Sequence, residues 1–84
     1  MARGIPLRTD YDADGLRALA RSTTNAKQAR RLLALSLLYE GSSRMEAADH
    51  ASASVQAVRD WVVRFNAEGP EGLIDRKSLG TPRV

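Results

Sequence analysis

The sequence predicts an all-α fold, a bundle of four helices in a single domain. The 84 residues are 43% hydrophobic and 27% charged, which is ordinary for a globular protein and allows one small core. Apolar residues recur at helical spacing, most clearly at Val58, Trp61, Val62 and Phe65. Capping residues precede the apolar segments, and turn-forming residues follow them. Helical periodicity between start and stop signals therefore predicts four helices.

The first helix is expected to begin at Asp10 or Asp12, either of which can serve as its N-cap, and to run to about Arg21. A Ser-Thr-Thr segment then breaks the helical pattern. The apolar side of this helix carries Leu16, Leu19 and Ala20.

The second helix is expected to begin at Asn25, with Gln28 completing a box-like start, and to run to Glu40. Gly41 follows at the position where a left-handed residue closes a helix. This helix is apolar on more than one side, which leaves two interpretations open. It is either the central helix of the bundle or a surface for homodimer formation, and the residues that would form that surface are Leu35, Leu38 and Tyr39.

The third and fourth helices are joined by a short break. Ser43 and Glu46 have the spacing of a capping box, which begins a short helix over Met45 to about His50. A Ser-Ala-Ser segment follows, and the fourth helix covers Val55 to Glu68. Two helices joined so tightly form a helix-turn-helix over Ser43 to Glu68, a motif that presents its second helix to a DNA major groove.

The segments on either side complete the expected organisation. Gly69 and Pro70 stop the fourth helix, and Leu73 and Ile74 are expected to fold back onto the helices. We expect an N-terminal arm at residues 1–9, a DNA-binding domain at 10–74 and a basic linker or tail at 75–84.

Several residues between about 25 and 73 match the pattern of a known family. They are the run Arg30 to Leu35, Glu40-Gly41, Ser43 with Glu46-Ala47-Ala48, Ser54, Val58 to Trp61 and the run Arg64 to Leu73. On these residues the chain resembles the N-terminal helix-turn-helix domain of mariner-like insertion-sequence transposases, which is paired-domain-like and homeodomain-like. The resemblance implies sequence-specific binding of double-stranded DNA at transposon terminal inverted repeats, with the chain an excised domain or a truncated reading frame.

The sequence departs from this family at three places. The family usually has a glycine in the turn where this chain has Ser52, and a hydrophobic residue in place of His50. Its Gly-Arg-Pro tail is replaced here by Gly80-Thr81-Pro82-Arg83. The resemblance also implies that DNA cutting and joining belong to a separate catalytic domain with a carboxylate metal site. We therefore expect no enzyme activity and no catalytic residues in this chain.

The fourth helix supplies the candidates for reading bases. Its apolar face must lie in the core, so its opposite face and its start are left for DNA. The carboxamide of Gln56 can form two hydrogen bonds to adenine, and the guanidinium of Arg59 can contact guanine or a phosphate. Asp60 could accept from cytosine, or could pair with Arg64 one helical turn later. The base-reading candidates are Ser54, Val55, Gln56, Arg59 and Asp60.

Basic residues and one helix start supply the candidates for phosphate contacts. Ser43 can cap its helix and bind a phosphate at the same time. Arg3 and Arg8 in the arm could also touch the phosphate backbone. The phosphate candidates are Lys27, Arg30, Arg31, Ser43, Arg44, Arg64, Arg76, Lys77 and Arg83.

Composition narrows the remaining classes of function. There is no cysteine and only one histidine, so we expect no disulfide, no metal site and no cofactor. No signal peptide or membrane-spanning run is visible, which predicts a cytoplasmic, bacterial-type protein without a membrane partner. The net charge of +3 is modest. Two alternatives are open: a free-standing transcriptional regulator that uses the same surface as a dimer, and a helical protein-interaction module that does not bind DNA. The modest charge and the presence of Asp60 keep the second alternative open.

Overall fold

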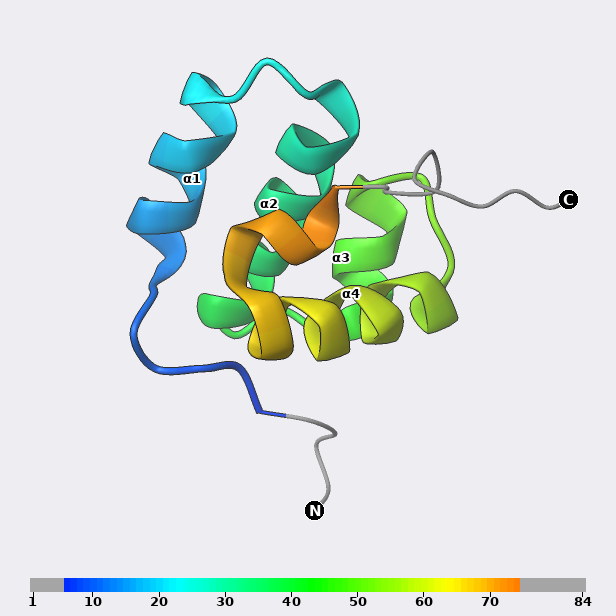
Figure 1. The fold of residues 1–84 in the computed structure, drawn as a ribbon. Coiled ribbons are helices and arrows are strands. Elements are labelled where there is room, and N and C mark those ends of the chain that lie inside the picture. The colour runs from blue at the N-terminus through cyan, green and yellow to red at the C-terminus, as the bar shows by residue number, and fades with distance from the viewer. Residues whose placement is uncertain (1–5, 75–84) are drawn as a thin grey trace, which may run out of the picture.

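The computed structural model describes residues 6–74, which form four α-helices and one 3-10 helix and contain no strand (Figure 1). This confirms the predicted all-α helix-turn-helix fold. The elements are α1 (Ala13–Ser22), α2 (Ala26–Tyr39), α3 (Arg44–His50), α4 (Val55–Glu68) and η1 (Gly69–Leu73). Predictions made for residues 1–5 and 75–84 lie outside the described residues.

All four α-helices begin at side-chain caps that the sequence predicts. The side-chain oxygens of Asp12, Asn25, Ser43 and Ser54 each accept a hydrogen bond from the backbone N–H three residues later. At α3 the capping box is complete, because the side chain three residues after Ser43 accepts from the Ser43 N–H. Gly41 closes α2 with a φ of 100°, a left-handed conformation that glycine adopts without a steric penalty.

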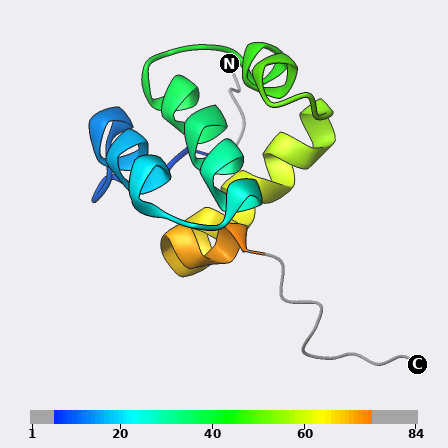
Figure 2. The ribbon, with the colours of Figure 1, turned by 90° about the horizontal axis from the view of Figure 1, so that it is seen from above.

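The helix α2 lies at the centre of the domain. It packs against α1 on one side and against α3, α4 and η1 on the others (Figures 1 and 2). Leu32, Ala34 and Leu35 on α2 are fully buried, which explains why this helix is apolar on several sides. Leu38 and Tyr39 are partly buried against the core. The central-helix interpretation is therefore confirmed, and Leu35 has no surface to offer a second copy of the chain.

The core is closed by α3, α4 and the chain after α4. Small residues line the buried side of α3, where Ala47, Ala48 and Ala51 allow α4 to approach closely. The buried side of α4 consists of Val58, Trp61, Val62 and Phe65, as its periodicity predicts. Leu73 in η1 is fully buried and folds back onto the helices as expected, whereas Ile74 is half-buried.

The start of α2 differs from the predicted box. Asn25 caps the helix, but the side chain of Gln28 does not return to it and is 7% exposed. Gln28 Nε2 donates to the Pro70 carbonyl at 2.9 Å, and its Oε1 accepts from the Thr23 hydroxyl. A glutamine that is buried in this way has its polar atoms satisfied, and it ties the start of α2 to η1.

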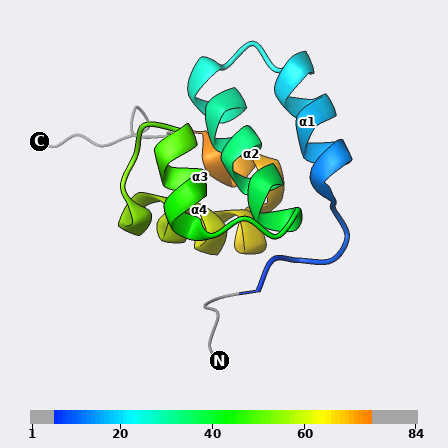
Figure 3. The same ribbon diagram turned by 180° about the vertical axis from the view of Figure 1, so that it is seen from behind.

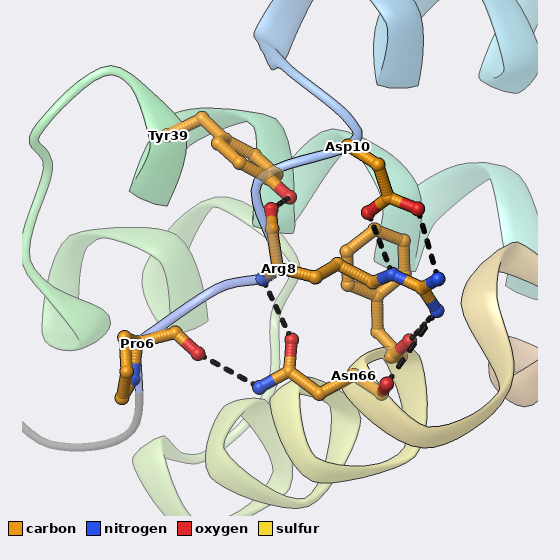
Figure 4. Close-up of polar contacts among 6 residues, drawn as sticks. Pro6, Arg8, Asp10, Tyr39 and Asn66 are labelled. Carbon is orange, nitrogen blue, oxygen red and sulfur yellow. Dashed lines mark hydrogen bonds and ion pairs between the residues drawn. The ribbon is translucent and has the colours of Figure 1, made fainter.

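The backbone of the predicted N-terminal arm is bound to the domain from Pro6 onward (Figure 4). The amide of Asn66, near the end of α4, donates to the Pro6 carbonyl at 2.8 Å and accepts from the Arg8 N–H at 2.9 Å. The Tyr39 hydroxyl donates to the Arg8 carbonyl from the opposite side. Residues 6–8 are therefore held between the ends of α2 and α4.

The side chain of Arg8, a possible phosphate contact in the sequence, has partners within the domain. It forms an ion pair with Asp10 at 2.8 Å, and this hydrogen bond lowers the pKa of the Asp10 carboxyl. Its Nη1 donates to the Phe65 carbonyl at 3.2 Å, so the guanidinium binds a backbone acceptor near the carboxyl-terminal end of α4 (Figure 4). It also lies 5.4 Å from the ring centroid of Tyr11. Arg3, the other arginine of the arm, lies outside the described residues.

Candidate nucleic-acid interface

The turn between α3 and α4 depends on a left-handed residue. Ser52 has a φ of 56°, a left-handed conformation that glycine adopts more easily than serine. Its N–H donates to the Asp49 carbonyl at 3.2 Å, and the next N–H, that of Ala53, donates to the Ala48 carbonyl at 2.8 Å. These bonds close α3 in the manner of a Schellman motif, with a serine in the glycine position. They set the direction in which the chain enters α4.

The helix α4 has a buried apolar side and an exposed, mostly polar side. Its inward side is almost entirely buried, with Trp61 only 7% exposed. Its outward side exposes Gln56, Arg59, Asp60 and Val63. Side chains at these spacings follow one face of a helix. The structure therefore brings three of the predicted base-reading residues together on one exposed face.

The start of α4 is also accessible. Ser54 is exposed, and its hydroxyl oxygen accepts from the Ala57 N–H at 3.0 Å, which makes it the N-cap. Val55, the first residue of the helix, is 41% exposed. An accessible helix start of this kind is the part of a recognition helix that approaches base edges.

Asp60 has a different partner from the one that the sequence suggests. Its Oδ1 accepts from Gln56 Nε2 at 3.3 Å, one helical turn earlier in α4. Arg64, the predicted partner, donates instead to the Ile74 carbonyl at 3.3 Å. The intrahelical ion pair is therefore replaced by an amide-to-carboxylate hydrogen bond on the exposed face.

The helix α3 packs against α4 (Figure 3). Ser43 takes part in the capping box, while Arg44 is half-buried. Met45 next to it is 70% exposed, the most exposed large apolar side chain in the described residues. Periodicity gives no signal for Met45, because it occupies the first turn of a helix of only seven residues.

The other phosphate candidates are dispersed. Lys27 and Arg30 are exposed on α2, outside the helix-turn-helix. Arg31 donates to the Leu73 carbonyl at 3.0 Å and lies over the ring of Trp61. Arg31 and Arg64 therefore have contacts inside the domain that need no DNA. The three candidates of the tail are outside the described residues, and they are Arg76, Lys77 and Arg83.

Two further kinds of feature are absent from residues 6–74. In that part of the chain, no group of three or more His, Cys, Asp or Glu side chains could hold a metal ion. None of the helices in this range combines the length and the apolar character that a membrane span requires.

The chain matches a family model described as a winged helix-turn helix over residues 31–84, more than half of its length. It is also similar to an uncharacterized protein, y4pG/y4sC, of Sinorhizobium fredii (strain NBRC 101917 / NGR234). The two are 52% identical over 80 residues, which cover 95% of this chain and 42% of that protein. The chain thus spans less than half the length of this relative. No solved structure matches it.

Proposed function

The chain belongs to the winged helix-turn-helix family, and we propose that it binds double-stranded DNA sequence-specifically with α4 in the major groove. One observation carries this proposal. The helix α4 buries an apolar face and leaves Gln56, Arg59 and Asp60 together on its opposite, exposed face. The donors and acceptors of Gln56 and Arg59 match base edges in the major groove.

The contacts around α4 support its use as a rigid reading element. Trp61 and its neighbours anchor the helix against α2 and α3, and Ser54 fixes its start. Because such anchoring fixes where the exposed side chains stand, little further ordering is needed when DNA arrives. Ser43 and Arg44, at the start of α3, are the candidates for contacts to the phosphate backbone.

We further propose that the target is a transposon terminal inverted repeat and that the chain is the DNA-binding part of a transposase. The support is the resemblance carried by Arg64 to Leu73 and the other matching residues. The greater length of the Sinorhizobium relative is compatible with a further domain. We do not propose self-association through α2, because Leu35 is fully buried and the Tyr39 hydroxyl is hydrogen-bonded to Arg8 within the domain.

Selection of bound sequences from a pool of random duplexes tests this function. We expect an enriched site without internal two-fold symmetry that recurs at both ends of an insertion element. A palindromic site would favour a free-standing regulator, since a symmetric dimer reads a symmetric operator. Failure to bind any duplex would contradict the proposal and favour a protein-interaction module.

Variants of α4 then test whether its exposed face reads the selected DNA site. Gln56→Ala and Arg59→Ala should each cost roughly 1–3 kcal/mol on the selected site and relax the preference at one position. Arg30→Ala is the matched control, because Arg30 is exposed on α2, outside the helix-turn-helix. Equal reductions in affinity for selected and random duplexes would assign the α4 residues to phosphates.

A further inference from the structure

The amide of Gln56 is held by Asp60 on the exposed face of α4. Gln56 Nε2 donates to Asp60 Oδ1 at 3.3 Å, and both side chains are exposed. We infer that Asp60 is a positioning residue for base recognition, which holds Gln56 in the orientation that reads adenine. This inference rests on the proposed function, because it assumes that α4 enters the major groove.

The chemistry of the two groups fixes the orientation. An ionised carboxylate can only accept hydrogen bonds, whereas a carboxamide has one donating end and one accepting end. If the Gln56 amide were turned over, its carbonyl oxygen would face the carboxylate and the two acceptors would repel. Asp60 therefore selects one of the two amide orientations before any DNA is present.

That orientation leaves the pattern that adenine requires. The amide nitrogen carries two hydrogens, so its bond to Asp60 leaves one donor beside the carbonyl oxygen Oε1. Adenine presents the N7 acceptor next to the N6 donor in the major groove, and this pair is complementary to that edge of Gln56. Guanine presents two acceptors, and its O6 would meet Oε1. A fixed amide should therefore discriminate between the two purines more strongly than a freely rotating one.

The charge of Asp60 has an opposite effect on affinity. A carboxylate on the face that meets DNA is repelled by the phosphates, so it should weaken binding to every duplex. Removing it should strengthen non-specific binding and reduce the preference for adenine. A residue that only stabilises the fold would weaken both, and a residue that only repels DNA would change the affinity alone. The opposed changes are therefore specific to a positioning role.

The experiment compares Asp60→Ala, Asp60→Asn and the charge control Asp49→Asn, each on the selected site and on duplexes altered at its adenine position. Asp49 is exposed on α3 and has the same charge. The wild type should prefer adenine by about 5- to 150-fold, the range expected of one bidentate contact. Asp60→Ala should lose most of this preference while binding random duplexes more tightly. Asp60→Asn should keep most of the preference, because its Oδ1 still accepts from Gln56. Asp49→Asn should leave the preference unchanged.

Three results would overturn the inference. The first is an Asp60→Ala protein that keeps its full adenine preference. The second is a loss of preference at a cytosine, which would make Asp60 itself a base reader. The third concerns a protein in which Gln56 is already alanine. If adding Asp60→Ala to that protein still lowers the adenine preference by the same factor, Asp60 does not act through Gln56, as a positioning residue must. In all three the wild type still binds its selected site. Failure of the proposed function differs, because the wild type would then bind no duplex.

Discussion

The guanidinium of Arg31 lies over the indole of Trp61, 5.4 Å from the ring centroid, while its Nη1 donates to the Leu73 carbonyl at 3.0 Å. A single side chain on α2 therefore joins α4 and η1. Arg31 is half-buried in this position, whereas its neighbour Arg30 is exposed. Two consecutive arginines with the same charge thus have different surroundings, and only one of them has its charged group built into the domain's packing.

Replacement of these two arginines should separate packing from surface charge. Arg31→Ala is expected to lower the free energy of unfolding by about 1–3 kcal/mol, because it removes a cation–π contact and a charged hydrogen bond. Arg30→Ala should change it by no more than about 0.5 kcal/mol. Urea denaturation followed by Trp61 fluorescence measures both. Equal effects of the two replacements would contradict the packing role of Arg31.

Replacement of Ser52 by glycine should stabilise the domain. A residue other than glycine in the left-handed region costs roughly 1–2 kcal/mol, and glycine loses part of that gain through its greater freedom in the unfolded chain. Ser52→Gly is therefore expected to raise the free energy of unfolding by about 1 kcal/mol. Ser52→Ala keeps a Cβ at the same φ and should give no increase. A destabilised Ser52→Gly protein would show that the turn does not have this conformation.

Gly72 should not tolerate a side chain. A Cβ at this position would lie 2.5 Å from the Arg64 carbonyl oxygen and 2.9 Å from its carbonyl carbon, so η1 or α4 would have to move. We expect Gly72→Ala to destabilise the domain by about 1–3 kcal/mol, as overpacking does. Glu71→Ala, at the exposed neighbouring position, is the control. Thermal unfolding of the two proteins side by side tests this, and similar midpoints would exclude the close approach.

The basic tail should contribute affinity with little sequence preference. Residues 76–84 contain Arg76, Lys77 and Arg83 and no acidic residue, and phosphate contacts carry no base information. Removal of residues 76–84 is expected to weaken selected and random duplexes about equally. It should also flatten the plot of log affinity against log salt by about 0.9 for every phosphate that the tail neutralises in the full chain. An unchanged slope would mean that the tail does not contact DNA.

The helices were predictable because their signals are local. Caps at Asp12, Asn25, Ser43 and Ser54 depend on residues three positions apart, and the core face of α4 follows from its period. Such signals do not depend on the rest of the fold.

The roles of the arginines were less predictable, because they depend on residues far away in the sequence. Arg8 binds the end of α4, and Arg31 binds the end of η1. The sequence does not distinguish an arginine that contacts a phosphate from one that donates to a backbone carbonyl. Asp60 illustrates the same limit within one helix, since Gln56 and Arg64 are equally spaced from it and only the structure distinguishes them.

The role of α4 as the recognition helix is tested most directly by recording the backbone and side-chain amide resonances of the protein by NMR while the selected duplex is added. If the exposed face of α4 meets DNA, the largest shifts should fall on residues 54–60, including the side-chain amide of Gln56, with smaller shifts at the start of α3. Residues of α1, on the other side of α2, should change least. Shifts concentrated in α1 or in the first turn of α2, with α4 unaffected, would contradict the assignment of α4 as the recognition helix.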